Sequence, residues 1–331
     1  MNDLEKEIRI NIVKQALLLN RKNNKLQQLF GLDSKTVEQF LTASRLIVTL
    51  PHASPNIFFP KVSASWYARH LQKYDDSVFH LRVVLSHNNF GDLGWRPYAW
   101  WYLDKNKIVR KASLFTRNKK KKHVTVLSQP PIEKIDAIDM SEFDRSLSFL
   151  ASGCINRAWS YITIMTSIER AAGLSLENKT LYITFDQLIM AIRQCKESSI
   201  TQKINQFLST RQARCLSSSG ELQPCDYSSN STILYDNPTN IALLSILGVK
   251  GVIGGQKMKN YWPEVAFCEE ALGTQKSPMR VLLIPEDNQI SQRVEPSSDI
   301  LNQLSEHGIP YSQGIALSEH GSFAKFIDPF Y

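Results

Sequence analysis

The spacing of apolar residues predicts three helices within the first 43 residues, of which the second and third are short. In the first of them, over 3–22, apolar residues recur at steps of three and four beside lysines and arginines: Leu4, Ile8, Ile12, Ala16 and Leu19. That spacing is typical of an amphipathic helix with one buried side. A second helix is expected over 26–30 and a third over 33–43, with a tight turn between them.

The turn between the second and third helices contains Gly31. Glycine adopts the left-handed conformation that ends many helices, so it is the expected residue at this position. Asp33 or Ser34 is expected to cap the third helix, because a side-chain oxygen there accepts hydrogen bonds from its first free amides. Six apolar residues are spaced to hold the two helices together: Leu26, Phe30, Leu32, Val37, Phe40 and Leu41.

Residues 26–43 therefore have the pattern of a helix-turn-helix DNA reader. The polar residues that we expect on the outside of the third helix are Ser34, Lys35, Thr36, Glu38 and Gln39. In a reader, Lys35 would contact phosphate or guanine, Gln39 adenine, and the two hydroxyl side chains backbone oxygens. An ordinary helical hairpin with a solvated polar face has the same pattern, so both interpretations stay open.

Residues 15–85, about a fifth of the chain, resemble the C subunit of the flagellar master activator and its relatives on mobile genetic elements. The resemblance depends on Ser54-Pro55, Pro60, Ser63 and Trp66-Tyr67, which follow the helical stretch. The spacing from Pro60 is one residue longer than in that family. The four-cysteine zinc cluster of the family has no counterpart here, so zinc is not carried over. The resemblance implies a DNA-binding activator.

From residue 78 onward the pattern changes to that of strands. An apolar run with polar interruptions predicts a strand over 78–85, and two further strands, 98–103 and 108–116, flank a short polar turn. The last two read as a β-hairpin. Its first strand is aromatic and its second is basic, which suits phosphate contact together with base stacking. The alternative is that the aromatic residues belong to the core and the lysines to a solvated turn.

Positive charge is concentrated in residues 105–122, which we call the basic segment. It contains nine cations and no carboxylate: Lys105, Lys107, Arg110, Lys111, Arg117, Lys119, Lys120, Lys121 and Lys122. The chain has a net charge of +8, so the rest of it sums to 8 − 9 = −1. A neutral body with one basic segment indicates a localised polyanion site. Four consecutive lysines repel one another unless an anion lies beside them.

A second candidate contact is the glycine- and lysine-rich stretch 248–259. Its cations are Lys250, Lys257 and Lys259. Glycines let a backbone approach phosphate closely, so contact with a nucleic-acid backbone is one interpretation. The spacing does not match the G-x-x-x-x-G-K-[ST] pattern of nucleotide-binding loops. A nucleotide site and a plain turn remain as alternatives.

The search for catalytic motifs gives no candidate. The chain contains no Gly-x-Ser-x-Gly, His-Glu-x-x-His or G-x-G-x-x-G, and the carboxylates of 133–139 and 285–287 lack the order of a metal-dependent nuclease. We therefore expect no catalytic residue, no metal and no cofactor. The five cysteines are expected to be free thiols. A charged N-terminus and the lack of a 20-residue apolar run predict a soluble, cytoplasmic protein with no membrane partner.

A proline-containing stretch near residue 130 predicts a boundary between two domains. Residues 1–130 are expected to form a nucleic-acid-binding domain, and 131–331 a second domain that docks to protein partners or oligomerises. A core-facing helical stripe is expected after the boundary: Phe143, Leu147, Leu150, Ile155, Trp159, Ile162 and Met165. The predicted fold is mixed α+β: a helix-turn-helix-like region with a small antiparallel sheet, then an α/β domain rich in helices.

The predicted function is that of a non-enzymatic protein that binds DNA or RNA, most specifically a sequence-reading DNA-binding regulator. One alternative is a nucleic-acid-binding subunit of a larger complex, in RNA-guided defence, transposition or replication. Another is a nuclease whose site has no recognisable motif.

Overall fold

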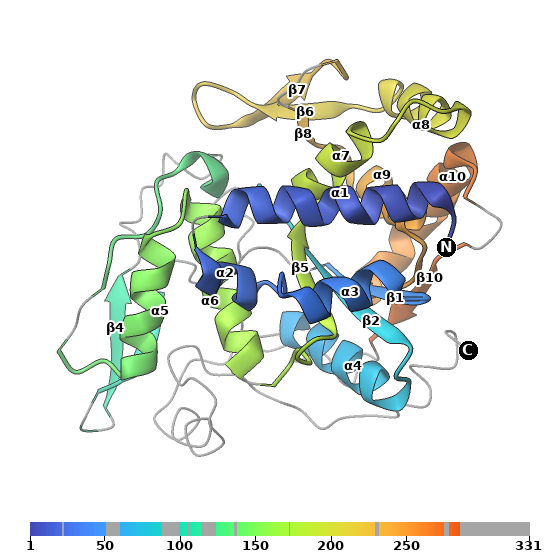
Figure 1. Ribbon diagram of the computed structural model, residues 1–331. Helices are drawn as coiled ribbons and strands as arrows, with labels where there is room; N and C mark the ends of the chain where they lie inside the picture. Colours follow the sequence, from blue (N-terminus) through green and yellow to red (C-terminus); the bar gives the residue numbers. More distant parts are fainter. Residues whose placement is uncertain are drawn as a thin grey trace.

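A five-stranded parallel sheet lies at the centre of the computed structural model (Figure 1). The structure describes residues 1–21, 23–50, 60–87, 99–104, 106, 108–113, 124–135, 138–171, 173–228, 232–274 and 278–284. The strands of this sheet are β1 (Arg45–Thr49), β2 (Val78–Val84), β5 (Thr180–Thr184), β9 (Val249–Gly254) and β10 (Arg280–Leu283). The predicted strand over 78–85 is thus confirmed as β2.

The order of the strands is β10-β9-β1-β2-β5, and all neighbours are parallel. The chain moves outward from β1 to β2 and β5, then crosses back to β9 and β10 on the other side of β1. This is the order of doubly wound α/β sheets, with the topological switch between β1 and β9.

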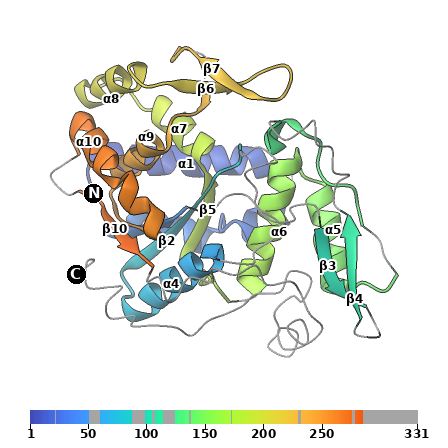
Figure 2. The same ribbon diagram turned by 180° about the vertical axis from the view of Figure 1, so that it is seen from behind.

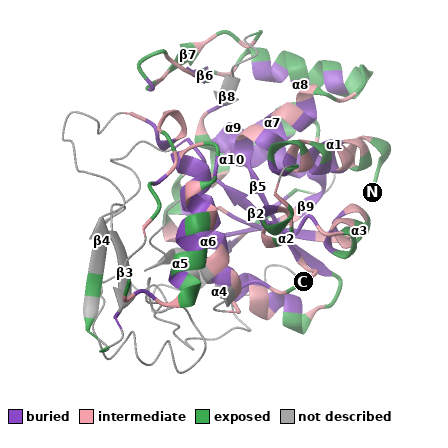
Figure 3. Ribbon diagram, turned by 60° about the vertical axis from the view of Figure 1, so that its left-hand side comes forward, coloured by how far each residue is buried: buried purple, intermediate pink, exposed green. Residues whose placement is uncertain are grey.

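Helices cover both faces of the sheet (Figures 1 and 2). On one face lie α4 (Pro60–Tyr74) and α6 (Arg157–Ala171), and on the other α1 (Asp3–Asn20), α3 (Ser34–Thr42) and α7 (Phe185–Arg193). Phe40 of α3 contacts Phe79 of β2, with 5.6 Å between ring centroids. Because its strands are covered on both faces, the sheet is buried (Figure 3).

The remaining helices lie around this core. They are α2 (Asn24–Leu29), α5 (Glu142–Ser152), α8 (Ser199–Ser209), α9 (Asn237–Ala242) and α10 (Trp262–Leu272), with 3₁₀ turns η2 (Val126–Ser128), η3 (Leu243–Leu247) and η4 (Gln256–Asn260). The predicted first helix is confirmed as α1, in which Asn2 and Glu5 form a capping box.

Two antiparallel sheets are inserted into the doubly wound core. The predicted hairpin is confirmed as β3 (Ala99–Leu103) paired with β4 (Val109–Ser113), which we call the ribbon. A second insertion follows α8 and precedes α9 in the chain. It is a three-stranded sheet with the order β7-β6-β8, and its strands are β6 (Ala213–Leu216), β7 (Leu222–Cys225) and β8 (Thr232–Leu234). The structure is therefore mixed α/β, with a parallel sheet that the sequence did not predict.

The central sheet crosses the boundary that was predicted near residue 130. β1 and β2 come from the first segment, yet β1 pairs with β9 and β2 pairs with β5 from the second. The larger hydrophobic core cluster likewise extends from Ile8 to Met279. The two sequence segments therefore contribute to one sheet and share one core.

The predicted core stripe after residue 141 is interrupted in the structure. Trp159, Ile162 and Met165 are buried, but Phe143 is 37% exposed and Ile155 is 62% exposed. The prediction is wrong for these two residues. A single helical period was assumed, whereas α5 ends at Ser152 and α6 begins at Arg157, so the apolar faces of the two helices have different phases.

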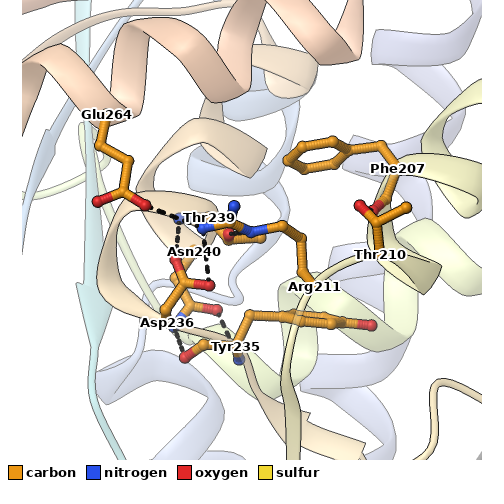
Figure 4. A network of polar contacts seen from close by, with 8 residues as sticks. All are labelled: Phe207, Thr210, Arg211, Tyr235, Asp236, Thr239, Asn240 and Glu264. Carbon is orange, nitrogen blue, oxygen red and sulfur yellow. Dashed lines mark hydrogen bonds and ion pairs between the residues drawn. The ribbon is translucent and has the colours of Figure 1, made fainter.

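A polar cluster around Arg211 joins the small insertion to the core (Figure 4). The guanidinium of Arg211 donates to Thr239 Oγ1 at 2.8 Å, to Asp236 Oδ2 at 3.0 Å and to Glu264 Oε1 at 3.2 Å. Asp236 also caps α9 by accepting from the Thr239 amide at 2.9 Å. Two carboxylates thus neutralise Arg211, so we assign this cluster a structural role.

Candidate nucleic-acid interface

The turn between α2 and α3 packs against β5, one of the two edge strands of the sheet. The Tyr182 amide donates to the Phe30 carbonyl at 3.0 Å, and Arg170 Nε donates to the Leu29 carbonyl at 2.5 Å. Gly31 has φ = +77°, and a Cβ at this position would lie 2.4 Å from the Thr180 carbonyl oxygen. The glycine is therefore needed because the turn covers a sheet edge, which would otherwise present unpaired backbone groups.

Asp33, and not Ser34, is the capping residue of α3. The Asp33 carboxylate accepts from the Thr36 amide at 2.9 Å and from the Thr36 hydroxyl at 2.6 Å. Burial acts to raise the pKa of Asp33, but the hydrogen bonds from Thr36 outweigh it and lower the pKa. Thr36 is buried, because its hydroxyl bonds back to the cap. The prediction that Thr36 faces outward is therefore wrong.

The outer surface of α3 carries little net charge. Ser34, Lys35 and Glu38 are exposed and Gln39 is half-buried, so the predicted base-contacting residues include one cation that lies one turn from a carboxylate. At the other end of α3, the buried Arg9 donates to the Phe40 carbonyl at 2.9 Å and to the Ala43 carbonyl at 2.8 Å. These contacts fix α3 within the body of the protein.

Two of the nine cations of the basic segment belong to the described residues, and both lie in the ribbon. Arg110 and Lys111 lie in β4, with Arg110 exposed. The other seven cations lie outside the described residues: Lys105, Lys107, Arg117, Lys119, Lys120, Lys121 and Lys122. The ribbon lies away from the five-stranded sheet, on the α5 side of the molecule (Figures 1 and 3).

Asp104 begins the turn of the ribbon. Its carboxylate accepts from the amides of Asn106 at 2.8 Å and Ile108 at 2.9 Å, and from Arg110 Nε at 2.9 Å. The Ile108 amide, followed by Arg110, holds the pKa of Asp104 below its ordinary value. The Asp104 carboxylate, which directly precedes the basic segment, therefore has its hydrogen-bond donors within the ribbon.

The lysines of 248–259 lie in two different elements. Lys250 lies near the start of β9, whereas Lys257 and Lys259 lie in η4, beyond the end of that strand. Gly254 lies four steps along the strand from Lys250, which is about 13 Å at 3.3 Å per step. A Cβ at Gly254 would lie 1.8 Å from Sδ of Met258, so this glycine makes room for a packed side chain.

A groove that the sequence analysis missed lies between α2 and α5, and we call it the α5 groove. Its volume is about 830 Å³. Four of its lining residues are cationic: Arg21, Lys25, Lys134 and Arg145. None of its described lining residues is a carboxylate, and Phe143 and Phe149 line it too. The residues come from several separate segments, so the only signal in the sequence was the run 143–149, which has a phenylalanine at each end and Arg145 between them.

A second polar cluster lies inside the core, between the sheet and α6. Arg82 of β2 forms an ion pair with Glu169 of α6, and Nη1 of Arg82 donates to Thr49 Oγ1 at 3.0 Å. Tyr182 donates to Glu169 Oε2 at 3.0 Å, and Thr49 Oγ1 lies 2.8 Å from His80 Nε2. Each of these five residues is at most 2% exposed, so we assign the cluster a structural role in this conformation.

The buried histidine predicts a pH dependence of stability. Burial, together with the Arg82 charge, holds the pKa of His80 well below its ordinary value, so His80 is neutral in the folded protein. In the unfolded chain it binds a proton near pH 6.5. Folding stability is therefore expected to fall as the pH drops below about 6.5, by up to about 1.4 kcal/mol per pH unit for this group. Urea unfolding of the parent protein and His80→Gln between pH 5 and 8 checks this, since parallel curves would contradict it.

Ser86, His87 and Asp186 meet at the carboxyl ends of β2 and β5, but not as a nucleophilic triad. Ser86 Oγ donates directly to Asp186 Oδ1 at 2.8 Å, and His87 Nδ1 lies 3.4 Å from Ser86 Oγ. In a triad the histidine lies between the serine and the carboxylate. The half-buried thiol of Cys195 is not activated either, since burial and Glu7 raise its pKa to about 11.

Comparison with protein-family models and with curated proteins gives no relative of this chain. No protein-family model matches this chain, and no curated protein matches it. The resemblance to the flagellar master activator therefore stays a prediction. Within the described ranges, no group of three or more histidine, cysteine, aspartate or glutamate residues is placed to hold a metal ion. None of the described helices has the length and apolar composition needed to cross a membrane.

Proposed function

We propose that this protein is a non-enzymatic nucleic-acid-binding protein that holds a phosphate backbone with its ribbon. The observation that carries the proposal is the concentration of nine cations in 105–122, on and beside an antiparallel ribbon, in a chain that is otherwise close to neutral. Asp104, the carboxylate at the start of the turn, is already occupied by two amides and Arg110. The ion pair with Asp104 neutralises Arg110, so the proposal is based on the other eight cations of the segment.

In its most specific form the proposal is a DNA-binding regulator that also reads sequence through α3. Ser34 and Lys35 are exposed at the start of that helix, and Gln39 is half-buried. The near-neutral surface of α3 means that the ribbon supplies most of the affinity and α3 only the selectivity. The Lys35→Ala and Gln39→Ala variants would then lose selectivity among duplex sequences while retaining non-specific binding.

The basic segment is tested by changing Lys119, Lys120, Lys121 and Lys122 to alanine together. Affinity for duplex DNA is expected to fall at least tenfold at moderate salt. The slope of log K against log salt should become shallower by up to about 3.6, because each lost phosphate contact removes about 0.9. Fluorescence anisotropy with a labelled duplex, over a series of salt concentrations, measures both quantities.

A matched control removes four exposed lysines elsewhere on the surface: Lys6, Lys14, Lys73 and Lys203. This variant has the same net charge as the 119–122 variant, so a difference between them reports position and not total charge. Equal losses in the two variants would contradict the assignment to the basic segment. A parent protein that shows no salt-dependent binding to duplex DNA, single-stranded DNA or RNA would contradict the proposed function itself.

A further inference from the structure

The α5 groove combines positive charge with exposed aromatic surface. We propose that it binds a single-stranded segment of nucleic acid, with its cations on the phosphates and its phenylalanines against unpaired bases. The proposal rests on the proposed function, and it adds a second contact surface that recognises a different form of the ligand.

The charge of the groove fits a phosphate backbone. Arg21 and Lys25 approach from the end of α1 and the start of α2, and Arg145 approaches from α5 on the opposite side. All three side chains are exposed, so they can reach a ligand without first losing a buried partner. A strand lying between them would meet cations on both sides, and each neutralised phosphate would release bound counterions.

The aromatic residues of the groove indicate a ligand that has bases as well as phosphates. Phe149 is 68% exposed and Phe143 is 37% exposed, although both lie on a helix whose other apolar residues pack into the core. Their α-carbons are six residues apart on α5, which is about 9 Å along the helix axis. Stacking of a base on an aromatic side chain changes affinity by about 5- to 150-fold per base, and it is tolerant of sequence.

The size of the groove favours an unpaired strand over a duplex. A volume of about 830 Å³ is in the range of pockets that hold small organic ligands, so it suits a few nucleotides at most. The faces of paired bases are already stacked within a duplex, so only unpaired bases can cover Phe149. An acidic peptide is the competing ligand, but it offers no planar groups to the two phenylalanines unless it is also aromatic.

The experiment uses the full chain with two fluorescent probes, a twelve-nucleotide poly(dT) strand and a twelve-base-pair duplex. Phe149→Ala is expected to weaken binding of the single strand at least fivefold while leaving duplex binding unchanged. Arg145→Glu is expected to weaken single-strand binding at least tenfold. Phe267→Ala is the matched control for Phe149→Ala, because Phe267 is 62% exposed on α10, far from the groove in sequence, and should leave both affinities unchanged.

Each outcome separates this inference from the proposed function. If the variant that replaces the lysines of 119–122 loses duplex binding but Phe149→Ala and Arg145→Glu bind poly(dT) like the parent, the groove assignment fails and the proposed function stands. If the parent binds neither probe, nor an RNA strand of the same length, both fail. Tighter binding of a poly-glutamate peptide than of poly(dT), lost in Arg145→Glu, would overturn the inference in favour of a protein ligand. Thermal unfolding of each variant confirms that the fold is retained.

Discussion

Replacing Glu169 with leucine is expected to lower the free energy of unfolding by about 3–5 kcal/mol, because it leaves the Arg82 guanidinium buried without a counter-charge. The Arg82 side chain is fully buried and that of Glu169 is 2% exposed. Nε of Arg82 also donates to Glu169 Oε2 at 3.1 Å, so the two groups meet through two parallel contacts. Urea unfolding of the variant and the parent at pH 7.5 measures the loss.

The double variant Arg82→Leu/Glu169→Leu tests whether the loss comes from the pair itself. Each single variant leaves one buried charge without its counter-charge, whereas the double variant leaves none. The stability lost in the double variant is therefore expected to be smaller than the sum of the two single losses by about 2 kcal/mol or more. Some loss remains because Tyr182 and Thr49 lose hydrogen-bond partners. Glu270→Leu, at an exposed carboxylate on α10, is the control and should change stability by less than about 0.5 kcal/mol. Strictly additive single losses would contradict a coupled pair.

The features of the fold that could be predicted are those formed by residues close to one another in the sequence. The helix α1, the cap of α3 (predicted at Asp33 or Ser34) and the hairpin of the ribbon each depend on residues close together in the chain, so periodicity and turn chemistry are sufficient to find them. The same applies to β2, whose apolar run is visible despite His80 and Arg82.

The parallel sheet could not be predicted in the same way. β1 is only five residues long, and its partners β2 and β9 lie more than 30 and 200 residues away along the chain. Parallel pairing leaves no turn signal between the two strands, unlike a hairpin. The α5 groove was missed for the same reason, since Lys25 and Arg145 come together only through the packing of α2 and α5 on α6.

Changing Gly31 to alanine is expected to destabilise the protein by about 2–4 kcal/mol. Alanine at φ = +77° is strained, and its Cβ would lie 2.4 Å from the Thr180 carbonyl oxygen, so the turn must move away from β5. That movement would also weaken the hydrogen bond from the Tyr182 amide to the Phe30 carbonyl. Chemical unfolding gives the free-energy change, and hydrogen exchange at the Tyr182 amide reports the edge contact directly.

Gly173→Ala is the matched control for this substitution. Gly173 has φ = +67°, and nothing lies within 4 Å of a Cβ built on it, so its replacement introduces the backbone strain alone, at about 1 kcal/mol. The amount by which Gly31→Ala loses more stability than Gly173→Ala then measures the contact of the turn with β5. If the two variants lose equal stability and Gly31→Ala instead abolishes discrimination among DNA sequences, the turn serves the DNA reader and not the sheet edge. A loss of stability at unchanged DNA selectivity would show that the glycine is required by the docking of the α2–α3 turn on β5.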